Sequence, residues 1–119
     1  MVHKRKKVAK IVEELTMFFF SVGATKMNSG IEYDGMHAKI TFSSDFELEY
    51  KRKVEDLEKY FNEPKNAGME DIYWGLAGTG DPGEPGELIL LGMMIDRAEV
   101  DVRDGFANLV LYKELIERF

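Results

Sequence analysis

The stretch MNSGIEYDGMHAKITF, residues 27–42, decides the fold that we expect for this chain. Apolar and polar residues alternate on both sides of Asp34-Gly35, a dipeptide that suits the two-residue type I′ turn of a β-hairpin. One side of the hairpin is apolar, with the expected pairs Tyr33–Met36, Ile31–Ala38, Ser29–Ile40 and Met27–Phe42. The other side is polar, with the expected pairs Glu32–His37, Gly30–Lys39 and Asn28–Thr41. The pattern predicts one face on a core and the other on water or a partner.

A second hairpin is expected around Asp104-Gly105, which repeats the turn signal. Apolar residues alternate with charged ones on the way into this turn, and the expected core-facing set is Ala98, Val100, Val102, Ala107, Leu109 and Leu111. If Arg103 joins the turn, a bulge shifts the pairing by one residue, and Phe106 and Val110 face the core instead.

Helices are expected before and after the first hairpin. Steps of three and four residues predict a helix over about residues 5–22 that ends at Gly23, with a buried stripe of Val8, Ile11, Val12, Leu15, Phe18, Phe19 and Val22. Ser44-Asp-Phe-Glu47 has the form of a capping box at the start of another helix. The expected buried residues of that helix are Tyr50, Val54, Leu57 and Phe61, and Pro64 stops it.

Further along, residues 65–68 are expected to be a linker and residues 69–76 a short helix, with Met69, Ile72, Tyr73 and Leu76 inward. The apolar run 88–95 suits a buried helix or a buried strand, and we favour the helix because Leu and Met are good helix formers. Leu115, Ile116 and Phe119 suggest a terminal helical turn. We therefore expect one α+β domain over residues 1–119. Its architecture would be a two-layer sandwich, a four-stranded sheet from two Asp-Gly hairpins with helices on one face.

Composition narrows the classes of function. The chain has 119 residues, no cysteine, and a net charge of −6, so disulfides and thiolate catalysis are excluded. Residues 1–10 hold five basic residues and no acid, which leaves 11 basic against 22 acidic residues elsewhere. We expect the basic start to be frayed and solubilising, and the acidic body to repel nucleic acid and anionic membranes. The chain should be soluble and cytoplasmic, and its lack of glutamine is a thermophile tendency.

A glycine-rich loop over residues 75–86 precedes the run 88–95. It holds five of the eleven glycines and two of the three prolines, and it contains a G-x-G-x-x-G at Gly78, Gly80 and Gly83. Glycines ahead of a helix can cradle a phosphate, but the charged residues here are acidic, so their field repels one. We expect a stiff connector or a recognition loop for a basic partner, with the candidate residues Trp74, Gly78, Gly80, Asp81 and Glu84.

Catalytic and metal motifs are missing. The sequence holds two histidines, His3 and His37, without a zinc-binding spacing, and it lacks the Walker and G-x-S-x-G patterns. A salt bridge with Glu32 is the expected role of His37. Glu13 with Glu14, or Asp101 with Asp104, could form acid–base pairs, but among 22 carboxylates no pair stands out. We expect no catalytic residue, no metal and no cofactor.

The order of the expected elements and the amino-acid sequence of residues 78–113 resemble the histidine-kinase-like (GHKL) ATPase fold of sensor kinases, gyrase and anti-sigma kinases. The stretch GELILLGMMIDRAEVDVRDG, residues 86–105, followed by LVLYK, looks like the last helix and hairpin of anti-sigma kinases. Gly78-Thr-Gly80 would stand at that family's second glycine motif. The resemblance implies a helix, two strands, a glycine-bearing lid, a helix and two closing strands, built around ATP.

This chain departs from that family at the residues that hold the nucleotide. The family's N-box pairs a Glu with a magnesium-binding Asn four residues on, whereas here Glu14 is followed by Phe18 and Glu13 by Met17. Of the adenine-binding Asp-x-Gly-x-Gly motif, residues 44–47 keep only Asp45. The resemblance with these departures implies a nucleotide site that has degenerated and an ATPase activity that is lost.

We therefore expect a non-catalytic interaction or regulatory module that binds a protein partner or forms a homodimer. The outer face of the second hairpin is the expected interface, because it presents Tyr112 with either Phe106 and Val110 or their alternates. The alternative is a degenerate nucleotide-binding protein.

Overall fold

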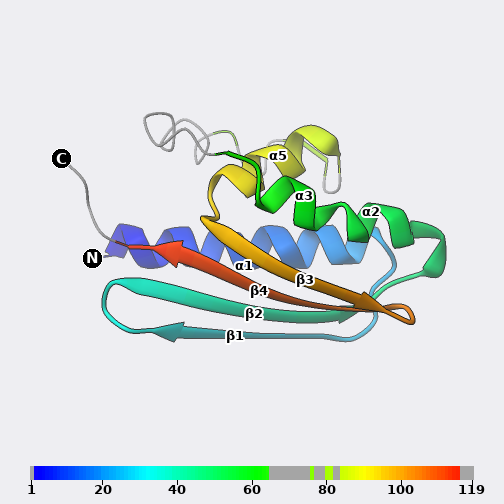
Figure 1. The fold of residues 1–119 in the computed structure, drawn as a ribbon, viewed down its shortest axis with the longest axis horizontal. Helices are drawn as coiled ribbons and strands as arrows, with labels where there is room; N and C mark the ends of the chain where they lie inside the picture. Colours follow the sequence, from blue (N-terminus) through cyan, green and yellow to red (C-terminus); the bar gives the residue numbers. More distant parts are fainter. Residues whose placement is uncertain (1, 65–75, 77–79, 82–83, 116–119) are drawn as a thin grey trace.

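The computed structural model describes residues 2–64, 76, 80–81 and 84–115. Its first half contains α1 (Val2–Ser21), β1 (Met27–Tyr33), β2 (His37–Asp45), a 3₁₀ turn η1 (Leu48–Tyr50), α2 (Lys51–Glu55) and α3 (Leu57–Phe61). Its second half contains α5 (Pro85–Met93), β3 (Arg97–Arg103) and β4 (Phe106–Glu114). The two hairpins join into one antiparallel sheet with the strand order β1-β2-β4-β3 (Figure 1). The predicted α+β fold with a four-stranded sheet from two hairpins is therefore confirmed.

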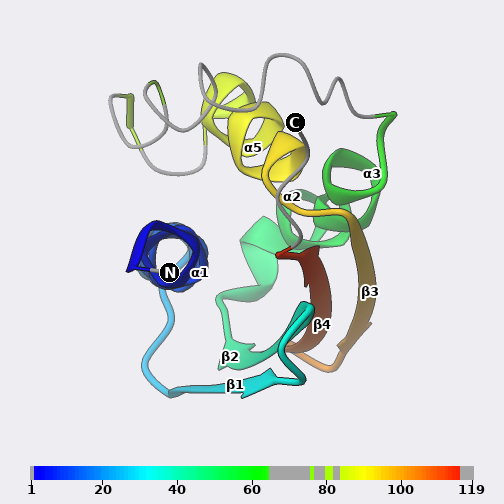
Figure 2. The same ribbon diagram turned by 90° about the vertical axis from the view of Figure 1, so that its left-hand side faces the viewer.

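One side of the sheet faces the helices. Figure 2 looks along the sheet and shows it curving around α1, with α2, α3 and α5 on the same side. Alternate residues of β2, β3 and β4 point to this side and are buried there: Ala38, Ile40, Phe42, Ala98, Ala107, Leu109 and Leu111. The core thus lies between the concave face of the sheet and the helices, as the period of two along each strand requires.

Helix α1 supplies the largest part of the helical side of the core. The whole stripe predicted from its periodicity is buried except Val12, which is partly buried. Within it, the ring of Phe19 stacks on that of Phe42 at a centroid distance of 5.4 Å. Gly23 follows the helix with φ +84°, so it provides the left-handed residue that ends a helix. The helix already begins at Val2, and the prediction of a frayed start is wrong for the residues from there on.

The first hairpin folds with a register two residues away from the prediction. Ile31 pairs with Ile40, Tyr33 with Ala38, and Glu32 with Lys39 rather than with His37. The turn residues are Gly35 and Met36, because the Asp34 carboxylate accepts the N–H groups of Met36 and His37 at 3.0 and 2.7 Å. Since the shift is even, each residue keeps its expected face.

A second expectation fails at the same hairpin. Ile31 and Tyr33 lie on the core side of the sheet, yet they are 44 % and 46 % exposed. The reason is that, among the strands, α1 packs mainly on β2, whereas β1 lies at the edge of the sheet. The outer strand therefore has a concave face that α1 covers only in part.

The second hairpin matches the main prediction. Arg103 pairs with Phe106, so the loop is Asp104-Gly105 and no bulge is present in this pairing. Both loop residues have positive φ, +50° and +76°, as a type I′ turn requires. Phe106 and Val110 consequently point away from the helices.

The predicted capping box does not form. Ser44 lies buried within β2, because the strand continues to Asp45, which pairs with Phe106 of β4. The following helical segment begins only at Leu48, with Glu47 as an N-cap residue that makes no side-chain cap. The segment is also divided at Asp56 into α2 and α3. Of its predicted buried residues, Val54, Leu57 and Phe61 are buried and Tyr50 is partly buried.

The apolar run 88–95 forms most of α5, so the favoured helix is confirmed, with Pro85 in its first turn as helix starts allow. This helix packs closely on α3, because Gly92 lies against the backbone of Tyr60. The side chain of Asn62 then connects α3 to the third strand: its amide donates to the Ala98 carbonyl at 2.9 Å and accepts from the Ala98 N–H at 3.0 Å. These contacts fix both helices relative to β3.

Some expectations concern residues that the structure describes only in part. The linker 65–68, most of the short helix 69–76, and Ile116 and Phe119 lie outside the described residues. Leu76 is described and is 48 % exposed, so its predicted inward position is wrong. Leu115 is buried and follows β4 directly, and the rest of the predicted terminal turn lies outside the described residues. No helix within the described ranges is long and apolar enough to span a membrane.

Candidate interaction surfaces

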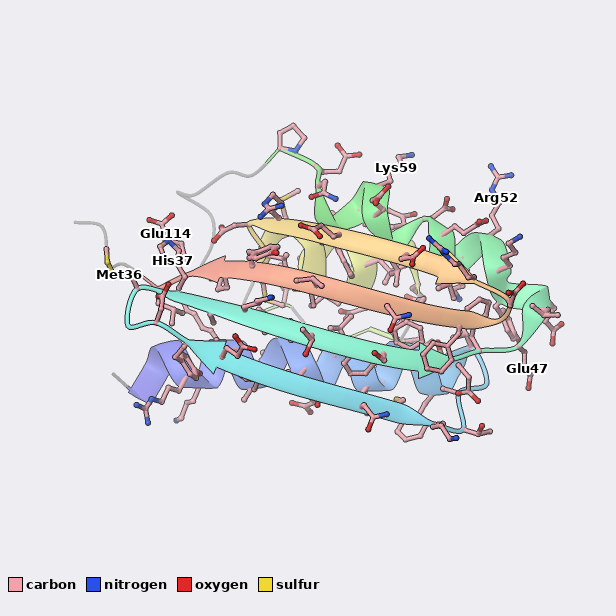
Figure 3. All side chains as sticks on the ribbon, turned by 60° about the horizontal axis from the view of Figure 1, so that its bottom comes forward. Met36, His37, Glu47, Arg52, Lys59 and Glu114 are labelled. Carbon is pink, nitrogen blue, oxygen red and sulfur yellow. The ribbon has the colours of Figure 1, made fainter. Side chains whose placement is uncertain are left out.

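The face of the sheet that points away from the helices carries the outward residues of the second hairpin. Figure 3 looks onto this face, with the strands in front of the helices. Along β4, Phe106, Val110 and Tyr112 point outward and are partly exposed. The predicted interface residues Phe106 and Tyr112 thus lie on the outer face, in the inner strand β4.

Polar contacts occupy much of this outer face. The guanidinium of Arg97 lies 4.1 Å from the centroid of the Tyr112 ring, and it also pairs with Glu99 at 3.0 Å. Arg103 pairs with Asp101, again at 3.0 Å. Because charged side chains of β3 already contact the aromatic residue, the apolar stripe is narrow and its tyrosine is engaged within the chain.

The described part of the glycine-rich loop gathers at the start of α5. The Gly80 N–H donates to the carboxylate of Glu87 at 2.6 Å, and Glu87 is almost fully buried. Asp81 and Glu84 are exposed, and the Glu84 N–H donates to the Asp81 carbonyl at 3.2 Å. The Gly80 N–H, which a phosphate cradle would use, is thus directed at a carboxylate, and an anion would have to displace it.

A second carboxyl group lies near this point. Partial burial of Glu14 on α1 raises the pKa of its carboxyl above the usual value, and the nearby carboxylate of Glu87 raises it further. Lys10 acts in the opposite direction. The contact of the Glu87 carboxylate with the Gly80 N–H agrees with the sequence-based argument against phosphate.

The structure does not bring the predicted site residues together. Gly80, Asp81 and Glu84 lie at the start of α5, on the helix side of the sheet, whereas Phe106 and Tyr112 point from the opposite face. Trp74 and Gly78 lie outside the described residues. The predicted set is therefore two separate surfaces rather than one site.

A third surface, which the sequence analysis missed, lies along β1. It consists of Ile31, Tyr33 and Met36 on the first hairpin. Their side chains are 44 %, 46 % and 53 % exposed. We call these three residues the β1-side cluster. The guanidinium of Arg5 lies 5.9 Å from the Tyr33 ring, which shows that this side of α1 faces β1. No signal in the sequence indicated this surface, because the exposure of Ile31 depends on where α1 packs.

The tip of the first hairpin is tied to the end of β4. Met36 and His37 lie beside Glu114 in Figure 3, and the Leu115 N–H donates to the Met36 carbonyl at 2.7 Å. His37 lies 3.5 Å from the Asp34 carboxylate and pairs with Glu114 across the strands. The prediction that His37 pairs with Glu32 is wrong, because the register shift places Lys39 opposite Glu32. Hydrogen bonds from the Met36 and His37 N–H groups hold the pKa of Asp34 below its usual value.

Among the residues with described positions, no three His, Asp or Glu side chains gather as metal ligands. Comparison of the chain with protein-family models, with curated proteins and with solved structures finds no match.

Proposed function

We propose that this chain is a non-catalytic interaction module that acts by associating with a second copy of itself. The observation that carries the proposal is the β1-side cluster, three large apolar side chains exposed on the first hairpin at one edge of the sheet. Apolar side chains scattered singly over a surface are normal, but several along one edge mark an interaction site. The other two surfaces support binding less well, because one is narrow and internally paired and the other is acidic.

Sedimentation velocity over a range of concentrations tests this function on the unmodified chain. We expect a reversible dimer, with a mass twice the 13.7 kDa of one chain, that dissociates on dilution. The association should persist at high salt, because burial of apolar surface drives it rather than surface charge. A single species of 13.7 kDa at high micromolar concentration would contradict the proposal.

A degenerate nucleotide-binding protein is the second candidate. The order of helix, hairpin, helix and hairpin agrees with the order that the resemblance to histidine-kinase-like ATPases implies. Against it stands Glu87, whose carboxylate accepts the Gly80 N–H that an anionic ligand would need. Isothermal titration with ATP and magnesium distinguishes the two: we expect no heat and no thermal shift, whereas saturable binding would favour this candidate.

A further inference from the structure

The two edges of the sheet differ in how well they are protected against pairing. The sheet has β1 at one edge and β3 at the other. β3 reads RAEVDVR and carries four charged residues, whereas β1 reads MNSGIEY and carries only Glu32. Natural proteins protect open edges with charges, proline or bulges, because unpaired backbone groups otherwise recruit another strand. β1 lacks this protection, so its edge is suited to pairing.

The hydrogen-bonding groups of β1 are placed for such pairing. The Asp34 N–H donates to the His37 carbonyl, and the Asp45 N–H donates to the Lys26 carbonyl. By the alternation of an antiparallel ladder, the even-numbered residues of β1 bond to β2. The odd-numbered residues therefore direct their N–H and C=O groups to the open edge: Met27, Ser29, Ile31 and Tyr33. Within the described part of the chain, no strand pairs with that edge.

We propose that two copies of this chain pair antiparallel through β1, centred on Gly30, so that two four-stranded sheets join into one. The proposal rests on the self-association proposed above and names its surface and register. With Gly30 on the two-fold axis, Met27 is opposite Tyr33 of the second copy and Ser29 is opposite Ile31. All four are odd-numbered, so the free hydrogen-bonding groups meet. The entire strand is paired.

Charge and length select this register over its neighbours. Centring on Gly30 places Lys26 opposite Asp34 of the second copy, at both ends of the paired strands. Centring on Ser29 would leave Tyr33 opposite Thr25, which lies outside β1. Centring on Ile31 would place Met27 opposite Gly35 in the turn. The self-complementary pattern around Gly30 is what a second copy of this chain fits, and an unrelated strand has no reason to match it.

The same arrangement covers the β1-side cluster. In each copy α1 packs mainly on β2, so three strand spacings separate the two helices, which is roughly 14 Å where the joined sheet is flat and less where it curves. Helices in direct contact pack at about 8–10 Å, so a trough remains above the paired strands. Ile31 and Tyr33 of both copies line its floor.

Engineered cysteines test the register, since the chain has none of its own. Asn28 and Glu32 are exposed on the outer face and lie opposite one another in the proposed dimer, with Cβ atoms about 4.5 Å apart. Under mild oxidation, an equal mixture of Asn28→Cys and Glu32→Cys should form disulfide-linked dimers at least about tenfold faster than either variant separately. Each variant on its own places its cysteines about 13 Å apart.

Asn108→Cys, on the outer face of β4, is the control for association through that face. Circular dichroism melts confirm that each variant folds, and the double variant Asn28→Cys/Glu32→Cys should link as efficiently as the mixture. Equal linking of the mixture and of the separate variants would overturn the register, as would linking of Asn108→Cys with none in the mixture. If the cysteine variants contradict the register but the chain still sediments as a dimer, the proposed self-association stands and only its surface is wrong. If the chain sediments as a monomer, both the self-association and the β1 register are overturned.

Discussion

At the scale of single residues, Gly92 shows how closely α5 and α3 approach. A Cβ added at Gly92 would lie 2.2 Å from the Tyr60 carbonyl oxygen, far inside van der Waals contact. The obstacle is backbone, which cannot rotate away as a side chain can. Gly92 is therefore required by packing, and the glycine permits the helix contact that places α5 on the core.

We expect Gly92→Ala to lower the free energy of unfolding by about 1–3 kcal/mol, because the helices must separate to admit the methyl group. Urea denaturation measures the change. Gly86→Ala, in the first turn of the same helix, is the matched control: nothing lies within 4 Å of its Cβ, and alanine should stabilise by up to about 1 kcal/mol. Equal effects of the two substitutions would show that the close approach is absent.

Asp45 is the second residue with a structural consequence, because it joins the start of β1 to the end of β2. Its carboxylate accepts hydrogen bonds from the Thr25 hydroxyl and from the N–H groups of Lys26 and Thr25 at 2.9 and 2.7 Å. These bonds, the Thr25 hydroxyl first, hold the pKa of Asp45 below its usual 3.8. They favour the ionised form in the folded state only.

The lowered pKa predicts a particular pH dependence. The folded-state pKa is below the unfolded value, so the stabilisation is present above pH 3.8 and is lost as the pH falls through the folded pKa. Asp45→Asn should therefore be less stable than the wild type near neutral pH, and the two should converge in acid. Thermal melts between pH 7 and pH 2 make the comparison, and a difference that persists unchanged into acid would contradict it.

At the scale of elements, the two hairpins show what local sequence can and cannot specify. Both carry Asp-Gly, and the second turns there as expected, with Asp104 and Gly105 at positive φ. In the first hairpin, the Asp34 carboxylate accepts hydrogen bonds from two backbone N–H groups, and the two-residue loop consists of Gly35 and Met36 instead of Asp34 and Gly35. The alternation of apolar and polar residues determines which face of the sheet each residue lies on, and a register shift of two residues leaves those faces unchanged. The faces were therefore predictable from the sequence, whereas the cross-strand partners were not.

Gly35 has φ +92°, a conformation that a side chain disfavours. We expect Gly35→Ala to destabilise the chain by about 1–2 kcal/mol through backbone strain, although nothing lies within 4 Å of its Cβ. Chemical denaturation measures the loss against the same Gly86→Ala control. An alanine at residue 35 that is neutral or stabilising would mean that the turn relaxes to the two-residue loop at Asp34-Gly35 that the sequence suggests.

The candidate surfaces were predictable to a smaller degree than the elements. Alternation correctly placed Phe106 and Tyr112 on the outer face, because the second hairpin kept its simple turn. The same alternation could not predict the exposure of Ile31 and Tyr33, because these residues occupy the positions that core residues occupy in the pattern. Whether such a residue is covered depends on the position of α1 across the sheet, which is a property of tertiary packing rather than of the strand.

At the scale of the whole molecule, the position of α1 links fold to proposed function. Because α1 packs mainly on β2 and the α2 and α3 helices pack on β3, the sheet leaves β1 as an open, weakly charged edge with apolar residues beside it. A second copy would pair with that edge and cover the β1-side cluster in one step. The outer faces of the two copies would then form one extended sheet surface, with Phe106 and Tyr112 of each chain on it.

Amide hydrogen exchange of the wild-type chain, measured residue by residue as a function of protein concentration, tests this account most directly. The N–H groups of Ser29, Ile31 and Tyr33 point to the open edge, whereas those of Gly30 and Glu32 bond to β2 and serve as internal controls. We expect the odd-numbered amides to become protected as concentration rises into the range where the dimer forms, with little change at the even-numbered ones. Odd-numbered amides that exchange at the same fast rate at every concentration would contradict the pairing of β1.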